Sequence, residues 1–154
     1  MSIEAAHSQL AAQVGREVHV GDWIEVTQAR IDAFAAATGD FQWIHTDPER
    51  AARESPWRRT IAHGFLTLSL IPLLRGFAAG ELPFPGVRAI VNYGLGRVRF
   101  TNAVREGSRL RGRAKVLAVE EFRGGLQVSE EVTVEIEGES RPACVAETIA
   151  RLYF

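Results

Sequence analysis

The stretch Thr60-Ile61-Ala62-His63-Gly64-Phe65-Leu66-Thr67-Leu68-Ser69 opens the most apolar segment of the chain. The apolar run continues to Leu74 with Pro72 inside it, so we expect a buried helix from His63 that kinks or ends early at the proline. The first N–H groups of a helix have no carbonyl partner within it. Gly64 therefore offers a backbone N–H, at the positive end of the helix dipole, that can bind a developing oxyanion, although a glycine there also simply permits tight packing.

The second half of the chain predicts β-strands around this helix. Four β-rich stretches cover about residues 88–101, 108–121, 126–137 and 142–153, and glycine or charged turns separate them. One apolar helix combined with amphipathic strands indicates an α+β fold, in which an antiparallel sheet arranged as a meander curves around the helix.

The first half of the chain predicts short helices and strands. Residues 1–14 indicate a short helix or a partly ordered arm, and residues 18–26 are rich in β-formers. Thr27 is a candidate N-cap for a helix that runs to about Ala37, and Gly39 stands where a C-cap glycine belongs. We therefore expect residues 15–154 to form a single domain.

A second short helix is expected from about Thr46, because Thr46-Asp47-Pro48-Glu49 fits a capping box with proline in the first turn. This helix start places His45 immediately before it, whereas Asp40 follows the end of the preceding helix. An acid and an imidazole held in this way can orient a water molecule and move its proton. The simpler interpretation is that Asp40 caps a helix or forms a turn.

Composition excludes several classes of protein. The 154 residues include 18 basic and 19 acidic side chains, a balance that argues against a nucleic-acid partner. Cys144 is the only cysteine, so no internal disulfide and no cysteine-based zinc site can form, and no other metal-binding pattern is apparent. The apolar run from Gly64 is too short to cross a membrane, and no secretory signal precedes it. We expect a cytoplasmic protein.

Several segments resemble the MaoC-like dehydratase family, which includes the R-specific enoyl-CoA hydratases, and in particular its nodulation protein N branch. The resemblance spans about residues 15–154. It rests on five sequence motifs, which are Ala37-Thr38-Gly39-Asp40, Trp43-Ile44-His45-Thr46-Asp47-Pro48-Glu49-Arg50-Ala51, Ile61-Ala62-His63-Gly64-Phe65-Leu66-Thr67, Val91-Asn92-Tyr93-Gly94 and Arg97-Val98-Arg99-Phe100.

This resemblance implies a hot-dog fold, a homodimer and a coenzyme A thioester as substrate, with no cofactor. It implies hydration of trans-2-enoyl-CoA to R-3-hydroxyacyl-CoA, or the reverse dehydration. Asp40 and His45 would activate water, and the N–H of Gly64 would stabilise the enolate oxyanion. The common family motif reads Gly-Asp-x-Asn-Pro-x-His, but Gln42 and Trp43 occupy the Asn-Pro places here, a change that bears on substrate range more than on chemistry.

Further residues are candidates for substrate binding. Ser69 matches a family position near the catalytic water, although a helix hydroxyl often bonds back to a carbonyl instead. Asn92 lies on the first late strand, and strand alternation puts Arg97 and Arg99 on one face, where they can meet coenzyme A phosphates or form an ordinary solvated face. His63 is interpreted as structural, fixing the loop before the helix.

Two other functions remain open at this point. A hot-dog thioesterase would use the same oxyanion site but attack the thioester carbonyl, and the Gly-Asp…His motif favours the hydratases over it. A non-catalytic acyl-CoA-binding protein would keep the same residues without turnover.

Overall fold

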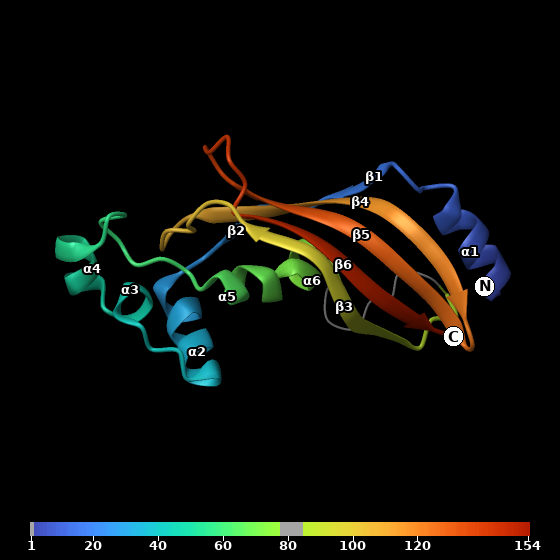
Figure 1. Ribbon diagram of the computed structural model, residues 1–154, viewed down its shortest axis with the longest axis horizontal. Coiled ribbons are helices and arrows are strands. Elements are labelled where there is room, and N and C mark those ends of the chain that lie inside the picture. The colour runs from blue at the N-terminus through green and yellow to red at the C-terminus, as the bar shows by residue number, and fades with distance from the viewer. Residues whose placement is uncertain (1, 78–84) are drawn as a thin grey trace.

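The computed structural model describes residues 2–77 and 85–154 (Figure 1). Its strands form one antiparallel sheet in the order β1-β4-β5-β6-β3, and β2 also pairs with β4. Their bounds are β1 (Glu17–Val20), β2 (Ile24–Glu25), β3 (Ala89–Phe100), β4 (Arg109–Phe122), β5 (Gly125–Ile136) and β6 (Cys144–Tyr153). The α+β class and the four late strands predicted from the sequence are confirmed.

The position of β3 corrects the expected meander. Strands β4, β5 and β6 follow one another as expected, but β3 pairs with β6 at the far edge of the sheet, from Ala89 opposite Tyr153 to Phe100 opposite Cys144. The segment after β3 is no tight turn, because it makes backbone hydrogen bonds to the first half of the chain. One of these runs from the N–H of Ala62 to the carbonyl of Val104 (2.7 Å). This crossover fixes the residues that precede Gly64.

The predicted apolar helix lies against the concave face of the sheet (Figure 1). It consists of two short pieces, α5 (Gly64–Ser69) and α6 (Ile71–Leu74), which meet at Leu70. The interruption agrees with the break expected at Pro72, whose nitrogen has no hydrogen to donate. The sheet therefore curves around a shorter central helix than the sequence suggested, in the arrangement of a hot-dog fold.

Two glycines let the end of α6 approach the sheet. A Cβ atom on Gly112 of β4 would lie 2.9 Å from both Cβ and the carbonyl oxygen of Leu74, and one on Gly21 would lie 2.5 Å from the same oxygen. His19 also bonds to this carbonyl through Nε2 (3.0 Å). The main core fills the space between these helices and β4, β5 and β6.

The N-terminal residues form the helix α1 (Ile3–Ala11), as predicted, capped by the side chain of Ser2. Ala6 and Leu10 are buried against the ends of β4, β5 and β6, in a second apolar cluster with Val116 and Leu126. Of the two expectations for this segment, a short helix or a partly ordered arm, the structure shows the helix, and it is packed onto the sheet. Among residues 2–77 and 85–154, no helix is long and apolar enough to cross a membrane.

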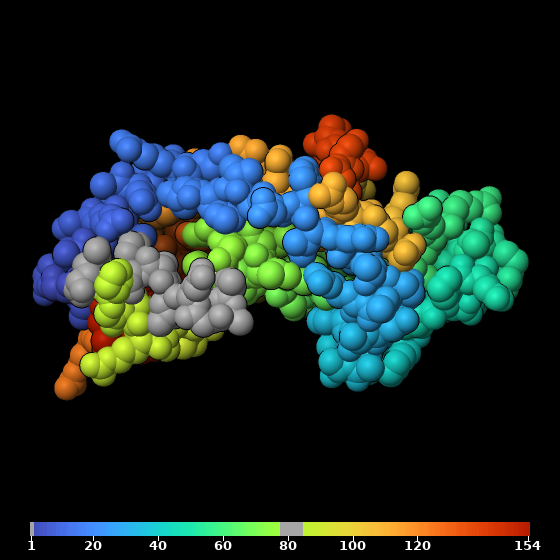
Figure 2. Space-filling view, turned by 180° about the vertical axis from the view of Figure 1, so that it is seen from behind, coloured from blue at the N-terminus to red at the C-terminus, as the bar shows by residue number. Residues whose placement is uncertain are grey.

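Three helices form a lobe beyond the sheet: α2 (Gln28–Thr38), α3 (Trp43–Thr46) and α4 (Pro48–Glu54) (Figures 1 and 2). Thr27 caps α2 and Gly39 ends it with a φ of 79°, as predicted. The expected capping box is wrong, because Asp47 caps α4 by accepting a hydrogen bond from the N–H of Arg50 (2.9 Å). Thr46 instead ends α3 and bonds back to the carbonyl of Gln42. His45 consequently lies inside a helical turn and not before a helix start.

Candidate active site

The lobe and the start of α5 bring Asp40, His45 and His63 together. Their potential ligand atoms all lie within 4.8 Å of one another. His45 and His63 are 8% and 3% exposed, whereas the side chain of Asp40 is 57% exposed. The cluster thus places two buried imidazoles beside a carboxylate that solvent or substrate can reach.

The hydrogen bond of His45 determines which ring nitrogen is reactive. Its Nδ1 lies 2.6 Å from the carbonyl oxygen of Ile61. A carbonyl only accepts, so Nδ1 carries the hydrogen and, in the neutral ring, Nε2 keeps its lone pair. The backbone of Ile61, three residues before Gly64, therefore prepares His45 to accept a proton at Nε2.

Burial lowers the pKa of His45 below its ordinary value of 6.5. The bond to the Ile61 carbonyl opposes this shift, the neighbouring His63 reinforces it, and Asp40 opposes it. The net lowering keeps His45 neutral at physiological pH, which is the state that a general base requires.

His63 occupies a more central place than its expected structural role suggested. Its ring is stacked on that of His45, with centroids 3.8 Å apart, and its Nε2 donates to the backbone carbonyl of Asp40 (2.9 Å). Its Nδ1 is buried and has no hydrogen-bond partner among the described residues. His63 therefore ties the loop of Asp40 to the start of α5, which explains the neighbouring histidine and glycine in the sequence.

Gly64 lies at the wall of a cavity of about 420 Å³ that is also lined by Trp57, Thr67 and Phe100. Among the described residues, no oxygen accepts a hydrogen bond from its N–H. A Cβ on Gly64 would lie 3.2 Å from the ring of Phe100. Because α5 has only six residues, the individual N–H, more than a helix dipole, is what this position offers to an oxyanion.

Sequence reasoning missed the residues that hold the cluster in place. Gln28, at the start of α2, donates from Nε2 to the carbonyl of His45 (2.8 Å), while its Oε1 accepts from the hydroxyl of Thr60. The role of the Ile61 carbonyl could not be predicted either, since every residue has a backbone carbonyl and the sequence does not show which one will bind His45. A half-buried glutamine and a buried threonine likewise give no periodic signal.

The predicted substrate-binding residues divide between locations. Ser69 and Asn92 line one cavity of about 650 Å³ on the concave face, and the hydroxyl of Ser69 bonds back to the carbonyl of Phe65 (2.7 Å), as the simpler interpretation expected. Gln42 is exposed next to the cluster, and its N–H points to Asp40 (3.4 Å). Trp43 packs under the guanidinium of Arg50, whose central carbon lies 4.4 Å from the centroid of the Trp43 ring.

Arg97 and Arg99 share one face of β3, as strand alternation predicted. They line a separate cavity of about 370 Å³ with Glu131 and Glu147. Phe100, the next residue along, faces Gly64, so the two arginines point to the opposite side of the sheet. The fold of one chain therefore does not bring them to the Asp40–His45 cluster.

The geometry disfavours other chemistries at this site. A metal must lie close to the plane of each imidazole that binds it, and the stacked rings of His45 and His63, with 26° between their planes, share no such point nearby. Cys144 is fully buried on β6, and burial raises the pKa of its thiol to about 11, which removes it as a nucleophile.

Comparison with known proteins gives consistent matches. Residues 9–139 match the family described as MaoC like domain. The 3-hydroxyacyl-thioester dehydratase Z of Mycobacterium tuberculosis is 47% identical over 145 residues, which cover 94% of this chain and 93% of that protein. Nodulation protein N of Rhizobium leguminosarum bv. viciae is 46% identical over 159 residues, with 98% and 93% covered.

Among solved structures, the (R)-hydratase from A. caviae involved in PHA biosynthesis superposes with a TM-score of 0.67 and 27% identity, covering 88% of this chain and 97% of that one. The fold agrees with the curved sheet and central helix described above. The chain belongs to the MaoC-like dehydratase family and is a hydro-lyase with a hot-dog fold.

Proposed function

We propose that this protein adds water across the trans-2 double bond of an enoyl-CoA to give R-3-hydroxyacyl-CoA, and catalyses the reverse dehydration. The observation that carries the proposal is the Nδ1–Ile61 hydrogen bond of His45, which leaves the lone pair on Nε2, in a cluster where potential ligand atoms of His45 and Asp40 lie within 4.8 Å of each other. The names of the similar proteins, a 3-hydroxyacyl-thioester dehydratase and an (R)-hydratase, support the same reaction.

In the proposed hydration, Asp40 holds the water and His45 takes its proton at Nε2 as the oxygen bonds to C3. The π electrons of the double bond move toward the thioester, whose oxygen becomes an enolate that the N–H of Gly64 binds. The proton then passes to C2, directly or through Asp40, so that both side chains return to their starting state.

We further propose a homodimer that pairs through β3. This strand is the edge of the sheet opposite β1, and its large apolar side chains are exposed: Val91 by 45%, Tyr93 by 55% and Leu95 by 49%. A long, apolar, unpaired edge strand is a template for pairing with another chain. Arg97 and Arg99 are proposed to meet coenzyme A phosphates from the other face of β3, because their forked donors suit phosphate, although Glu131 and Glu147 line the same cavity and would oppose this binding.

The test uses purified protein and crotonyl-CoA, followed through the loss of the enoyl absorbance, with chiral analysis of the product. Asp40→Asn and His45→Gln are each expected to lower kcat/KM by about 10²- to 10⁴-fold. Asp47→Asn is the matched control, because asparagine preserves the cap of α4 and full activity is expected.

Three results would contradict the proposal. Full activity of both variants would remove Asp40 and His45 from the reaction. Release of free thiol without hydration would identify a thioesterase. Binding of acyl-CoA without turnover of any enoyl-CoA would identify a binding protein.

A further inference from the structure

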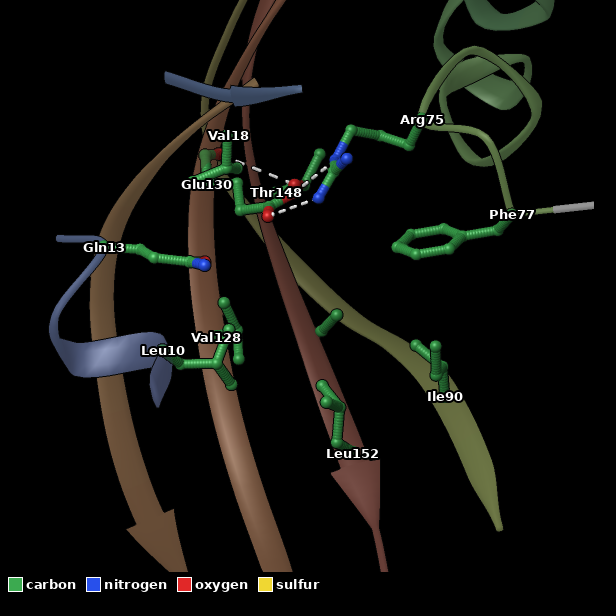
Figure 3. Close-up of a pocket in the computed structure, with 11 residues that line it drawn as sticks. Leu10, Gln13, Val18, Arg75, Phe77, Ile90, Val128, Glu130, Thr148 and Leu152 are labelled. Atoms are coloured by element: carbon green, nitrogen blue, oxygen red, sulfur yellow. Dashed lines mark hydrogen bonds and ion pairs between the residues drawn. The ribbon is translucent and has the colours of Figure 1, made fainter. Parts of the chain in front are cut away.

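Two neighbouring cavities lie on the concave face of the sheet beyond α5. The outer cavity, of about 650 Å³, is lined by apolar side chains that include Leu68, Pro72 and Leu95. The inner cavity, of about 160 Å³, lies between α1 and the sheet and is lined by Leu10, Val128 and Leu152 among others (Figure 3). It is similar in volume to apolar cavities of about 150 Å³ that hold a benzene-sized molecule.

An ion pair lies where the two cavities meet. Both are lined by Arg75, Phe77, Ile90, Glu130, Thr148 and Ala150. Arg75 reaches from the end of α6 to Glu130 on β5 and donates from Nε to Oε2 (2.8 Å) and from Nη2 to Oε1 (2.7 Å) (Figure 3). The two side chains are only 12% and 15% exposed. The junction between two apolar cavities is therefore charged and nearly dry.

This pair is a barrier to an apolar chain. A bidentate arginine–carboxylate pair is well satisfied by its own hydrogen bonds. A methylene chain laid over it would remove the remaining water from both charges and provide no partner in return, which is unfavourable. An acyl chain that fills the outer cavity therefore has no favourable way into the inner one.

We propose that the Arg75–Glu130 pair is a specificity determinant that stops the acyl chain at the end of the outer cavity. The inference rests on the proposed function, since it assumes that the thioester is held at Gly64. Gly64 lines a cavity of its own, and Leu68 and Ser69, one turn further along α5, line the outer cavity. In this proposal the acyl chain runs from the thioester at Gly64 along this turn of α5 into the outer cavity.

Helix geometry gives a rough limit for this chain. Arg75 follows Gly64 by eleven residues, and α5 and α6 are separated only by Leu70, so the backbone at these two residues lies at most about 16 Å apart at 1.5 Å per residue. An extended peptide spans about 3.5 Å per residue over three backbone bonds, which is about 1.2 Å per bond, and we apply the same value to an extended acyl chain. Straight acyl chains of up to about twelve carbons are therefore expected to fit before the pair.

The decisive variant is Arg75→Met combined with Glu130→Leu, which removes both charges and keeps the volume apolar. Either single change would leave a buried charge without its partner. The wild type and the variant are compared with octenoyl-, dodecenoyl- and hexadecenoyl-CoA. We expect kcat/KM for hexadecenoyl-CoA relative to octenoyl-CoA to rise at least about tenfold in the variant, because each newly buried methylene contributes about fourfold.

Two controls isolate the inner cavity. Adding Val128→Phe to the double variant fills this cavity, which Val128 lines and the outer cavity does not include, and should abolish the gain. Arg113→Met with Glu17→Leu removes a similar bidentate pair that lies outside both cavities, and should leave the ratio unchanged.

The outcomes separate this inference from the proposed function. A folded double variant that hydrates octenoyl-CoA with the wild-type length preference would overturn the inference alone. If no enoyl-CoA is hydrated, the proposed function fails, and the same length series of saturated acyl-CoA esters is measured by equilibrium binding. Wild-type affinity should then stop rising beyond dodecanoyl-CoA, and a continued rise to hexadecanoyl-CoA would overturn the inference even if the double variant does not fold.

Discussion

The imidazole rings of His45 and His63 are stacked, with their centroids 3.8 Å apart and 26° between their planes. Each ring donates to a backbone carbonyl, His45 to that of Ile61 and His63 to that of Asp40. Two positive charges at this separation would repel each other strongly, so the stack is built for no more than one protonated ring. The carboxylate of Asp40 is the nearby group that can offset that one charge.

The lowered pKa of His45 makes stability depend on pH. Below a pH of about 6.5, the unfolded chain protonates this histidine while the folded chain does not, so the unfolded state binds more protons. The free energy of unfolding contributed by neutral His45 is therefore present above that pH. It decreases as the pH falls toward the lower pKa of the folded state. Unfolding in urea between pH 5 and 8 measures this dependence, and His45→Gln should flatten it.

A slope unchanged in His45→Gln would show that another group controls this dependence.

His63 is expected to act as a positioning residue. His63→Phe keeps a ring against His45 but removes the hydrogen bond to Asp40. We expect kcat/KM to fall about tenfold or more, since Asp40 would no longer be held in position and would lose much of its contribution to catalysis. The acidic limb of the pH profile should also move to higher pH, because the neighbouring His63 helps to lower the pKa of His45.

If His63→Phe lowered kcat/KM by the same factor at every pH and left the acidic limb of the profile unmoved, His63 would contribute only packing. Phe34→Leu is a useful comparison, because Phe34 also contacts the ring of His63, at 5.0 Å between centroids, but bonds to none of the reacting groups.

The sequence predicted the elements of this fold better than their connections. Thr27 and Gly39 mark the ends of α2 because capping depends on side chains and a positive φ, which are local properties. The pairing of β3 with β6 depends on the crossover held by Val104, a long-range contact with no local signal. The same holds for the cluster, where Asp40 and His45 were found from their types and spacing, but the carbonyl of Ile61 that orients the base was not.

Gly64→Ala tests the proposed oxyanion site. The added methyl group would lie 3.2–3.3 Å from the ring of Phe100, and Phe100 is 46% exposed, so this ring can move aside with little loss of stability. We expect kcat/KM with crotonyl-CoA to fall about tenfold to a hundredfold, because the methyl group keeps the thioester oxygen away from the N–H. Gly64→Ala with Phe100→Leu relieves the contact, so recovery of the rate in this double variant would contradict the oxyanion role.

The proposed dimer is tested at the edge strand. Leu95→Lys places a charge on β3 where 49% of a leucine is exposed, and charged side chains block edge-to-edge pairing. We expect light scattering during size exclusion to show a dimer for the wild type and a monomer for the variant. Val20→Lys is the control, because Val20 is similarly exposed (45%) on β1 at the opposite edge, and loss of the dimer there instead would place the interface on β1.

The close approach of α6 to β4 predicts that Gly112→Ala is destabilising. The new methyl group would lie 2.9 Å from Cβ and from the carbonyl oxygen of Leu74, which is 2% exposed and also bonds to His19. The new methyl group would be enclosed between the backbone of Leu74 and strand β4, so no flexible side chain could move aside to make room for it. We expect a loss of about 1–3 kcal/mol in the free energy of unfolding, the usual result of overpacking, measured by urea titration.

Gly94→Ala is the control, because the nearest atom to its Cβ, on Ile149, would be 4.0 Å away. If Gly112→Ala were as stable as this control, α6 would have to move freely on the sheet, and Arg75, which follows the last residue of α6, would not be held in a fixed position.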